Sequence, residues 1–577
     1  MFFPRYNPVP VRPRSEILFW SAAVVMLLLF LGRNALWGME GRTAEIVRNM
    51  LLTGDIFSFQ INRVVQNSMP LGYWAVLPGT FLFGTDEFML RLPTAFFALV
   101  LLWATGKITE RLFDVQTALI SRWVLLGTYG FIFWARIASP DMANAAVTAC
   151  AAACFFYWKD EPDFKDYLLF YFLLGAGSLF KGIPVAAVTL ALIIPCAVVR
   201  RGLGKYCSLK NLAAFCCSAV FVIIVYLICG AADNSCPGGN PAEGAVDMLW
   251  KKQIWRLLDA RNLAQPFYCY IYHLPRILLP WSGIFIAGFI SFFKRRRELN
   301  PEFSALLTGM IIAFILFFLS GSRSWYYLLP LVPFCSVVTA AVLAGFSGES
   351  SVMDWLLELT YFALLIFASL AFALPIAIPL QGVIFSYHIP GCAIVFSCLA
   401  GSLVIILLIF DRGEDNFISR LFSMPPRIAG MTAGIAIAVT ALFCAVIPNF
   451  TVFRTEKPFV QELKKELEGI DPERIFIYSS SLHPRVLFYL SQERPVMCGK
   501  GISAFIHSNA GGRVAVIAED DTRGMNRLKT HLAFLPQTVF DVDHPHFKER
   551  RLSHESESKD KLRAWIIDVP AAAELNK

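Results

Sequence analysis

Residues 36–74 read LWGMEGRTAEIVRNMLLTGDIFSFQINRVVQNSMPLGYW and lie between two strongly apolar parts of the chain. Charged side chains gather in this stretch, whereas the flanking segments carry almost none. Its apolar and polar residues recur on opposite sides of a helix, the apolar side with Ala44, Val47 and Leu51 and the polar side with Glu45 and Arg48. This pattern predicts an amphipathic helix along a membrane surface, with an ordinary solvated loop helix as the alternative.

The composition points to a protein that crosses a membrane many times. Of the 577 residues, 56% are hydrophobic and 16% are charged, and the mean hydropathy is +0.57. In soluble domains about a quarter of the residues are charged. The net charge is +8, but the basic residues cluster in alternate loops. That placement follows the positive-inside rule and indicates contact with membrane lipids, with no nucleic-acid partner.

Apolar runs predict about thirteen transmembrane helices. They cover residues 17–36, 88–113, 117–137, 142–158, 167–180, 183–199, 212–229, 274–293, 303–319, 327–344, 355–380, 394–410 and 429–447. Basic residues in the amino-terminal tail and at 294–297 place that tail in the cytoplasm. The carboxyl end then lies on the outer side of the membrane. Pro70–Phe83 is also compatible with a re-entrant segment.

The composition changes after residue 448. VQELKKELEGI has the pattern of an amphipathic helix, and IFIYS, VLFYL, VAVIAED, TVFDV and AWIIDV are short β-rich runs. Residues 449–577 are therefore predicted to form a soluble α/β domain on the outer side of the membrane, with an accessory role. Residues 1–448 are predicted to form an all-α membrane domain with outer loops at 37–87 and 231–272.

Ionisable residues gather at the predicted outer ends of the spans. They include Glu40, Asp141, Lys181, Arg256 and Arg323. Such residues are costly near a membrane and therefore indicate function. Sugar transfer from a polyprenyl phosphate is one chemistry that fits, because cations stabilise a phosphate leaving group and a carboxylate activates an acceptor hydroxyl. Spacing alone does not distinguish this from other lipid-phosphate chemistry, from head-group pairing by Arg256 or from snorkelling by Lys181.

An ordered series of motifs resembles a known family. LWGMEGRTAEIVRNMLLTGD, FGTDEFMLRLP, SPDMAN, LFKG, IWRLLDARNLAQPFYCY and GSRSWYYLLP follow one another over about the first 350 residues. In this order they resemble the bacterial GT-C glycosyltransferases related to protein O-mannosyltransferases. The chain is most similar to the transferases that attach 4-amino-4-deoxy-L-arabinose to lipid A.

The resemblance implies an inverting transfer of a sugar from an undecaprenyl-phosphate carrier. It also implies that the protein lies in the inner membrane of a bacterium, with its amino terminus in the cytoplasm and residues 449–577 in the periplasm. The acceptor would be lipid A, another glycan or a protein on the periplasmic side. Glu40 would activate the acceptor, with Asp141 as its partner or as an alternate base. The resemblance also implies substrate-binding roles, with the donor phosphate held by Lys181, Arg256 and Arg323 and the pocket shaped by Arg42 and Tyr73.

Two departures from the family pattern concern a metal. The family's acidic pair is a single acid here, Glu40 followed by Gly41, and its Glu-Lys-Pro triplet is replaced by residues 67–70, NSMP. Since these positions are implicated in metal and phosphate binding in the family, a divalent metal is an open question and no other cofactor is expected. A catalytically inactive scaffold is one alternative. A transporter or flippase of lipid-linked sugars is another, although no repeated halves are found.

Overall fold

The computed structural model describes residues 11–62, 64–65, 70–232, 266, 268–319, 323–345, 351–373, 391–409, 417–441, 443, 455–478, 484–491, 497–499, 501–519, 537–538, 562–569 and 571. The chain divides into two compact units. The first comprises Met1–Gly32, Asn67–Gly79 and Phe88–Ile447, and the second Arg33–Gln66, Thr80–Glu87 and Pro448–Lys577. Each unit is described by itself.

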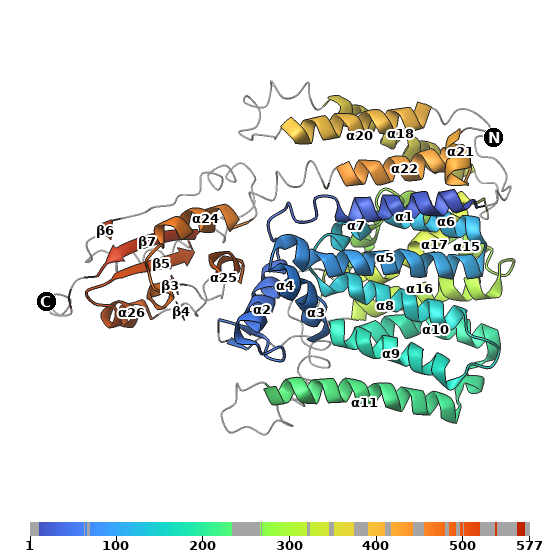
Figure 1. Ribbon diagram of the computed structural model, residues 1–577. Coiled ribbons are helices and arrows are strands. Elements are labelled where there is room, and N and C mark those ends of the chain that lie inside the picture. Colours follow the sequence, from blue (N-terminus) through green and yellow to red (C-terminus); the bar gives the residue numbers. More distant parts are fainter. Residues whose placement is uncertain are drawn as a thin grey trace. The chain divides into compact units, whose positions relative to one another are not determined.

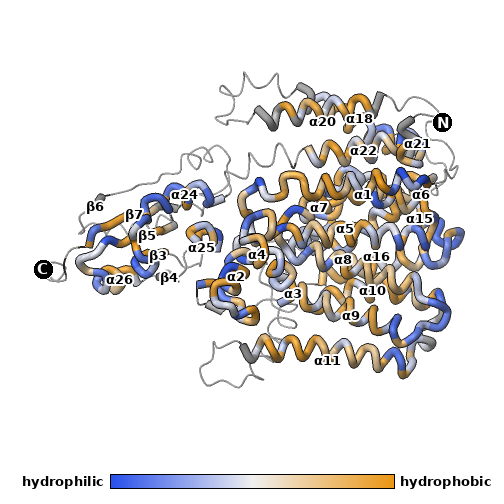
Figure 2. The backbone as a smooth tube through the Cα atoms, viewed as in Figure 1, coloured by the Kyte–Doolittle hydropathy of each residue, from blue (hydrophilic) through white to orange (hydrophobic). Residues whose placement is uncertain are grey.

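The first unit is helical (Figure 1). Its elements are α1 (Pro13–Leu28), α3 (Pro70–Trp74), α5 (Glu87–Leu112), α6 (Val115–Leu126), α7 (Tyr129–Ala135), α8 (Pro140–Phe156), α9 (Phe164–Lys181), α10 (Pro184–Arg201), η1 (Leu203–Tyr206), α11 (Leu209–Ala232), α14 (Cys269–Ile277), α15 (Ser282–Lys294), α16 (Pro301–Leu319), η3 (Trp325–Leu331), α17 (Val332–Leu343), α18 (Ser351–Ala373), α20 (Gly391–Ile409), α21 (Phe417–Phe422) and α22 (Pro426–Ala441). Helix α4 (Leu77–Phe83) contributes residues to both units. Figure 2 shows that hydrophobic residues dominate the long helices.

Several helices are long and apolar enough to cross a membrane. Within the described residues there are four, namely Glu87–Leu112, Leu209–Gly230, Pro301–Leu319 and Trp325–Leu343. Two bent pairs raise the number to six if each is one span: α6 with α7, bent by 67°, and α14 with α15, bent by 112°. The sequence was therefore right that this is a helical protein with several membrane-spanning segments.

The first predicted span, residues 17–36, is wrong at its carboxyl end. Helix α1 ends at Leu28, and Phe30 has a left-handed backbone with φ of 54°. The buried Arg136 donates hydrogen bonds to the carbonyl oxygens of Met26 at 2.8 Å, Leu27 at 3.1 Å and Leu29 at 2.6 Å. The last carbonyls of an α-helix generally lack partners within the helix. The guanidinium therefore completes the end of α1 and stabilises the turn that follows.

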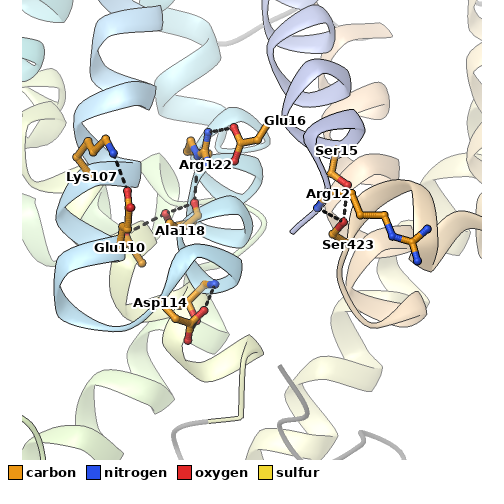
Figure 3. Close-up of polar contacts among 12 residues, drawn as sticks. Arg12, Ser15, Glu16, Lys107, Glu110, Asp114, Ala118, Arg122 and Ser423 are labelled. Atoms are coloured by element: carbon orange, nitrogen blue, oxygen red, sulfur yellow. Dashed lines mark hydrogen bonds and ion pairs between the residues drawn. The ribbon is translucent and has the colours of Figure 1, made fainter. Parts of the chain in front are cut away.

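The amino-terminal part of α1 is held by polar contacts, which Figure 3 shows. Glu16 accepts two hydrogen bonds from Arg122 of α6, at 2.6 Å and 2.5 Å. Ser15 and Ser423 bond through their hydroxyls at 2.5 Å, and the backbone amide of Arg12 donates to Ser423 at 3.1 Å. Charged and hydroxyl side chains thus connect α1 to α6 and to the turn after α21.

The second unit contains a mixed five-stranded sheet with the order β4-β3-β5-β7-β6. Strand β3 runs parallel to β4 and β5, whereas β7 is antiparallel to β5 and β6. The elements are α2 (Glu40–Thr53), β1 (Gln60–Ile61), β2 (Val64–Val65), α24 (Lys457–Glu466), η7 (Pro472–Arg474), β3 (Ile475–Tyr478), α25 (Pro484–Leu490), β4 (Met497–Gly499), α26 (Ile502–Ser508), β5 (Arg513–Glu519), β6 (Gln537–Thr538) and β7 (Leu562–Asp568). Phe476, Val516, Trp565 and Phe505 form part of its core.

Most of the elements predicted for this unit are present, but one was predicted as a strand and is a helix. IFIYS, VAVIAED and AWIIDV form β3, β5 and β7, and the predicted amphipathic helix forms α24. TVFDV meets β6 only at Thr538, and the rest lies outside the described residues. VLFYL was predicted to be β-rich but forms helix α25. Pro484 suits the first turn of a helix, and α25 buries Val486, Leu487 and Leu490 on one side.

The amphipathic helix predicted in residues 36–74 is confirmed as α2, but one residue expected on its exposed polar side is buried. Ala44, Val47 and Met50 are buried as expected, yet Glu45 is also only 1% exposed. Its carboxylate accepts two hydrogen bonds from Arg48, at 2.8 Å and 2.7 Å. Burial raises the pKa of Glu45, because the loss of water disfavours the charged form more than Arg48 and Asn49 favour it.

We predict that Arg136→Ala lowers the free energy of unfolding by about 2–3 kcal/mol, because hydrogen bonds from a charged donor to the end of α1 are lost. The thermal midpoint of the detergent-solubilised protein measures this change. Arg295→Ala is the control, since its ion pair with Glu298 joins two exposed side chains. Equal midpoints for the two variants would contradict the assigned role of Arg136.

The raised pKa of Glu45 predicts how stability depends on pH. Its protonated form is favoured in the folded state, so this contribution is complete below the unfolded pKa, near 4.5, and is lost as the pH rises through the raised folded pKa. The thermal midpoint of the wild type relative to Glu45→Gln should therefore fall as the pH rises from 4 to 8. Glu298→Gln, at an exposed position, is the matched control. A difference that rises with pH would show that the pair with Arg48 dominates instead.

Candidate active site

Asp141 lies at the start of α8 and is held there by its neighbour. Helix α8 begins at Pro140, and the Ser139 hydroxyl accepts a hydrogen bond from the Asp141 backbone amide at 3.3 Å. The same hydroxyl donates to the Asp141 carboxylate, which is almost completely buried. A negative charge is favourable at a helix amino terminus because the peptide dipoles point their positive ends there. The sequence SPD therefore both starts the helix and fixes a buried carboxylate.

Lys181, the last residue of α9, forms an ion pair with the Asp141 carboxylate. Its ammonium also lies over the rings of Tyr326 and Tyr327, 4.7 Å and 4.9 Å from their centres. Gly182 ends the helix with φ of 95°, a conformation that glycine adopts readily. The structure thus brings together two of the predicted site residues and surrounds the cation with one carboxylate and two electron-rich rings.

Aromatic side chains from η3 and α7 extend this site. Trp134 lies 4.8 Å from Tyr326 and 5.4 Å from Trp325, measured between ring centres. The guanidinium of Arg276 lies over Trp325 at 5.3 Å. None of these rings was singled out from the sequence, although Trp325, Tyr326 and Tyr327 follow Arg323 in GSRSWYYLLP. Three consecutive aromatic residues directly after an apolar span were the available signal.

The remaining predicted residues of the first unit have different surroundings. Arg323 is half-buried two residues before η3. Tyr73 is buried in α3, which packs against α9, so its helix adjoins the one that ends in Lys181. Arg256, like most of the predicted outer loop 231–272, lies outside the described residues.

Glu40 and Arg42 belong to the second unit. Glu40 is the first residue of α2 and is fully buried. Its carboxylate accepts a hydrogen bond from the backbone amide of Trp37 at 2.8 Å. Arg42 follows on the same helix and is half-buried. The predicted catalytic carboxylate therefore also has a structural task, because it binds an amide at the start of its own helix.

Packing against Arg485 explains why a glycine is needed at position 41, and the sequence did not reveal this. A Cβ atom at this position would lie 2.2 Å from Cγ and 3.0 Å from the backbone nitrogen of Arg485. Arg485 belongs to α25 and pairs with the buried Glu456 at 2.7 Å. The residue after Glu40 must be small because the backbone of α25 passes directly over it.

A divalent metal was left open by the sequence, and the described residues offer few ligands for one. Within them, no three His, Cys, Asp or Glu side chains are grouped so that they could hold a metal ion. Asn67, Ser68 and Met69, which replace the charged positions of the family triplet, lie outside the described part of the chain. A divalent metal therefore stays a prediction that the described residues do not support.

Comparisons with known proteins identify relatives of this chain. Residues 67–229 match the family model described as dolichyl-phosphate-mannose-protein mannosyltransferase. A protein of Aquifex aeolicus is 27% identical over 335 residues, covering 55% of this chain and 62% of its own. The undecaprenyl phosphate-alpha-4-amino-4-deoxy-L-arabinose arabinosyl transferase of Aeromonas hydrophila is 27% identical over 334 residues, covering 54% and 57%. The chain therefore spans less than two thirds of the length of these relatives.

Solved structures show the fold over nearly the whole chain. ArnT from Cupriavidus metallidurans bound to undecaprenyl phosphate matches with a TM-score of 0.69 at 18% identity, covering 96% of this chain and 97% of ArnT. Its apo state matches with a TM-score of 0.67 at 19% identity, with the same coverage. The resemblance found in the sequence motifs is thus confirmed: the chain has the membrane GT-C fold of ArnT and carries a segment similar to the protein mannosyltransferases.

Proposed function

We propose that this protein is an inverting glycosyltransferase of the bacterial inner membrane. It transfers a sugar from an undecaprenyl-phosphate carrier to lipid A, another glycan or a protein on the periplasmic side. The proposal includes thirteen spans, a cytoplasmic amino terminus and a periplasmic carboxyl-terminal domain. The basic run at 294–297, between α15 and α16, supports this orientation.

One observation carries the proposal most directly, the ion pair of the buried Asp141 with the half-buried Lys181 beside Tyr326 and Tyr327, in a chain with the fold of ArnT. A lysine held by a carboxylate and two rings is partly desolvated and already oriented. An incoming phosphate is a stronger partner for this cation, since it carries more charge and three acceptor oxygens. The relatives named for undecaprenyl-phosphate donors support this choice of ligand.

The donor half of the reaction uses the cations. The bond between the sugar's anomeric carbon and the bridging phosphate oxygen breaks, and its electron pair moves to that oxygen. Lys181 stabilises the charge that develops, together with Arg323 and Arg256. When phosphate engages Lys181, Asp141 loses its partner and becomes available to bind the acceptor or to accept a proton.

The acceptor half uses the carboxylates. Glu40 removes the proton from an acceptor hydroxyl, or orients an acceptor phosphate, as that oxygen attacks the anomeric carbon from the side opposite the leaving group. Attack from the opposite side inverts the configuration at this carbon. Arg42 and Tyr73 shape the pocket around the sugar.

Mass spectrometry of lipid A and total glycolipids tests the proposal in cells with the wild type, without the protein and with Glu40→Gln. Glutamine keeps an oxygen that can accept the Trp37 amide hydrogen, so the substitution removes the charge with little change to the helix start. We expect a sugar-sized mass on an acceptor only in the wild type, and unused lipid-linked sugar in the other two. Identical spectra from the three strains, with protein glycans also unchanged, would favour a transporter or an inactive scaffold.

Lys181 and Asp141 should affect different kinetic constants. Lys181→Ala should raise the donor KM at least ten-fold, as loss of a hydrogen bond to a charged group predicts. Asp141→Asn should lower kcat, because the carboxylate that would bind the acceptor or accept its proton is lost. The donor KM should not rise, because Lys181 remains and no carboxylate competes with the phosphate for it. Transfer assays with purified protein measure both, with the exposed Lys159→Ala as the matched lysine control. A similar rise in KM in both variants would mean that the pair acts only in folding.

A further inference from the structure

Helix α25 contacts the chain just before Glu40. The Tyr489 hydroxyl accepts a hydrogen bond from the backbone amide of Leu36 at 2.7 Å and donates one to the Glu87 carboxylate at 3.2 Å. Lys457 of α24 pairs with the same carboxylate and lies 5.4 Å from the centre of the Tyr489 ring. One tyrosine thus links three segments of the second unit that are far apart in sequence.

The start of α2 is fixed by two neighbouring amides. The Leu36 amide is bound by Tyr489, and the next amide, that of Trp37, is bound by Glu40 itself. Leu36 is fully buried, so loss of the Tyr489 hydroxyl would take the hydrogen-bond acceptor away from a buried amide. The direction of the Glu40 side chain therefore depends on where Tyr489 holds the preceding turn.

A second contact fixes the same helix from its side. Arg485 lies one helical turn before Tyr489 on α25, and its side chain and backbone lie directly against Gly41. The pair with Glu456 holds the Arg485 guanidinium at 2.7 Å, and Glu456 is itself 6% exposed. Figure 1 shows α2 and α25 side by side, and the two helices are in extensive contact.

We infer that Tyr489 and Arg485 are positioning residues for the transfer reaction and that they act through Glu40. The inference rests on the proposed function and deepens it, because it assigns to the carboxyl-terminal domain the task of orienting the catalytic carboxylate. The domain then contributes to catalysis by orienting Glu40, whereas the sequence suggested an accessory role. A displacement of about 1 Å at a catalytic group lowers the rate by as much as a hundred-fold.

The test compares full-length Tyr489→Phe with the wild type in detergent. Hydrogen–deuterium exchange of peptides covering residues 36–53 reports the position of α2, and transfer assays report kcat and the donor KM. We expect at least ten-fold faster exchange at the start of α2 and a kcat reduced ten- to hundred-fold, with the donor KM unchanged because Lys181 is untouched. Tyr478→Phe, at a half-buried position packed against the core of the same domain, is the matched control and should change neither.

A pair of variants tests the contact at Gly41. Gly41→Ala should lower kcat at least ten-fold, because its new methyl group overlaps the Arg485 side chain. Arg485→Ala removes the overlapping Cγ atom. The double variant should therefore be more active than the product of the two single effects predicts. Purely additive losses, or an unchanged kcat in Tyr489→Phe, would overturn the inference even if every variant is folded.

The inference and the proposed function fail in different ways. If the wild type transfers sugar, Glu40→Gln does not and Tyr489→Phe equals the wild type, only the inference fails. If the wild type and Glu40→Gln show no difference in transfer, the proposed function fails. In that case hydrogen–deuterium exchange at the start of α2 alone tests whether α25 fixes this helix. Unchanged exchange in Tyr489→Phe would then overturn the positioning role as well.

Discussion

Peptide groups at the ends of helices need partners, and in an apolar bundle there is little water to supply them. This protein supplies them with charged side chains that are buried or half-buried. Arg136 binds three carbonyls around the end of α1, and Arg200 binds the carbonyls of Phe155 and Trp158 where α8 ends. Asp141 and Lys181 occupy the helix ends that suit the signs of their charges. The fold therefore depends on charged side chains placed where helices begin and end.

The same constraint explains how a reactive site is built at little additional cost to folding. A carboxylate at the start of α8 and an ammonium at the end of α9 are stabilised by the helices that carry them, so each is held without help from a ligand. Their mutual ion pair then keeps both charges neutralised in the absence of substrate. An anion that binds Lys181 would replace one negative partner of the lysine by another, and the Ser139 hydroxyl would still bind the Asp141 carboxylate.

The sequence predicted those features that depend on local composition. Long apolar runs identified the helices, and the spacing in residues 40–53 identified α2. It failed where distant residues decide the outcome. The end of α1 is set by Arg136, about a hundred residues away, and Glu45 is buried because other segments cover the polar side of α2. VLFYL has β-forming residues, but packing against α2 and the position of Pro484 favour a helix. The aromatic residues around Lys181 were visible only as an unexplained cluster in the sequence.

The close approach of Arg485 to Gly41 has a consequence for how related chains diverge. A loop near the amino end and a domain at the carboxyl end share one interface, so the sequence of neither can change independently of the other. Recombination that exchanges only the domain after residue 448 between two related chains would pair the loop with a foreign helix and lose the fit. A functional chimaera must carry residues 33–66 together with the domain after residue 448. The two segments are inherited as one module, although nearly four hundred residues separate them in the sequence.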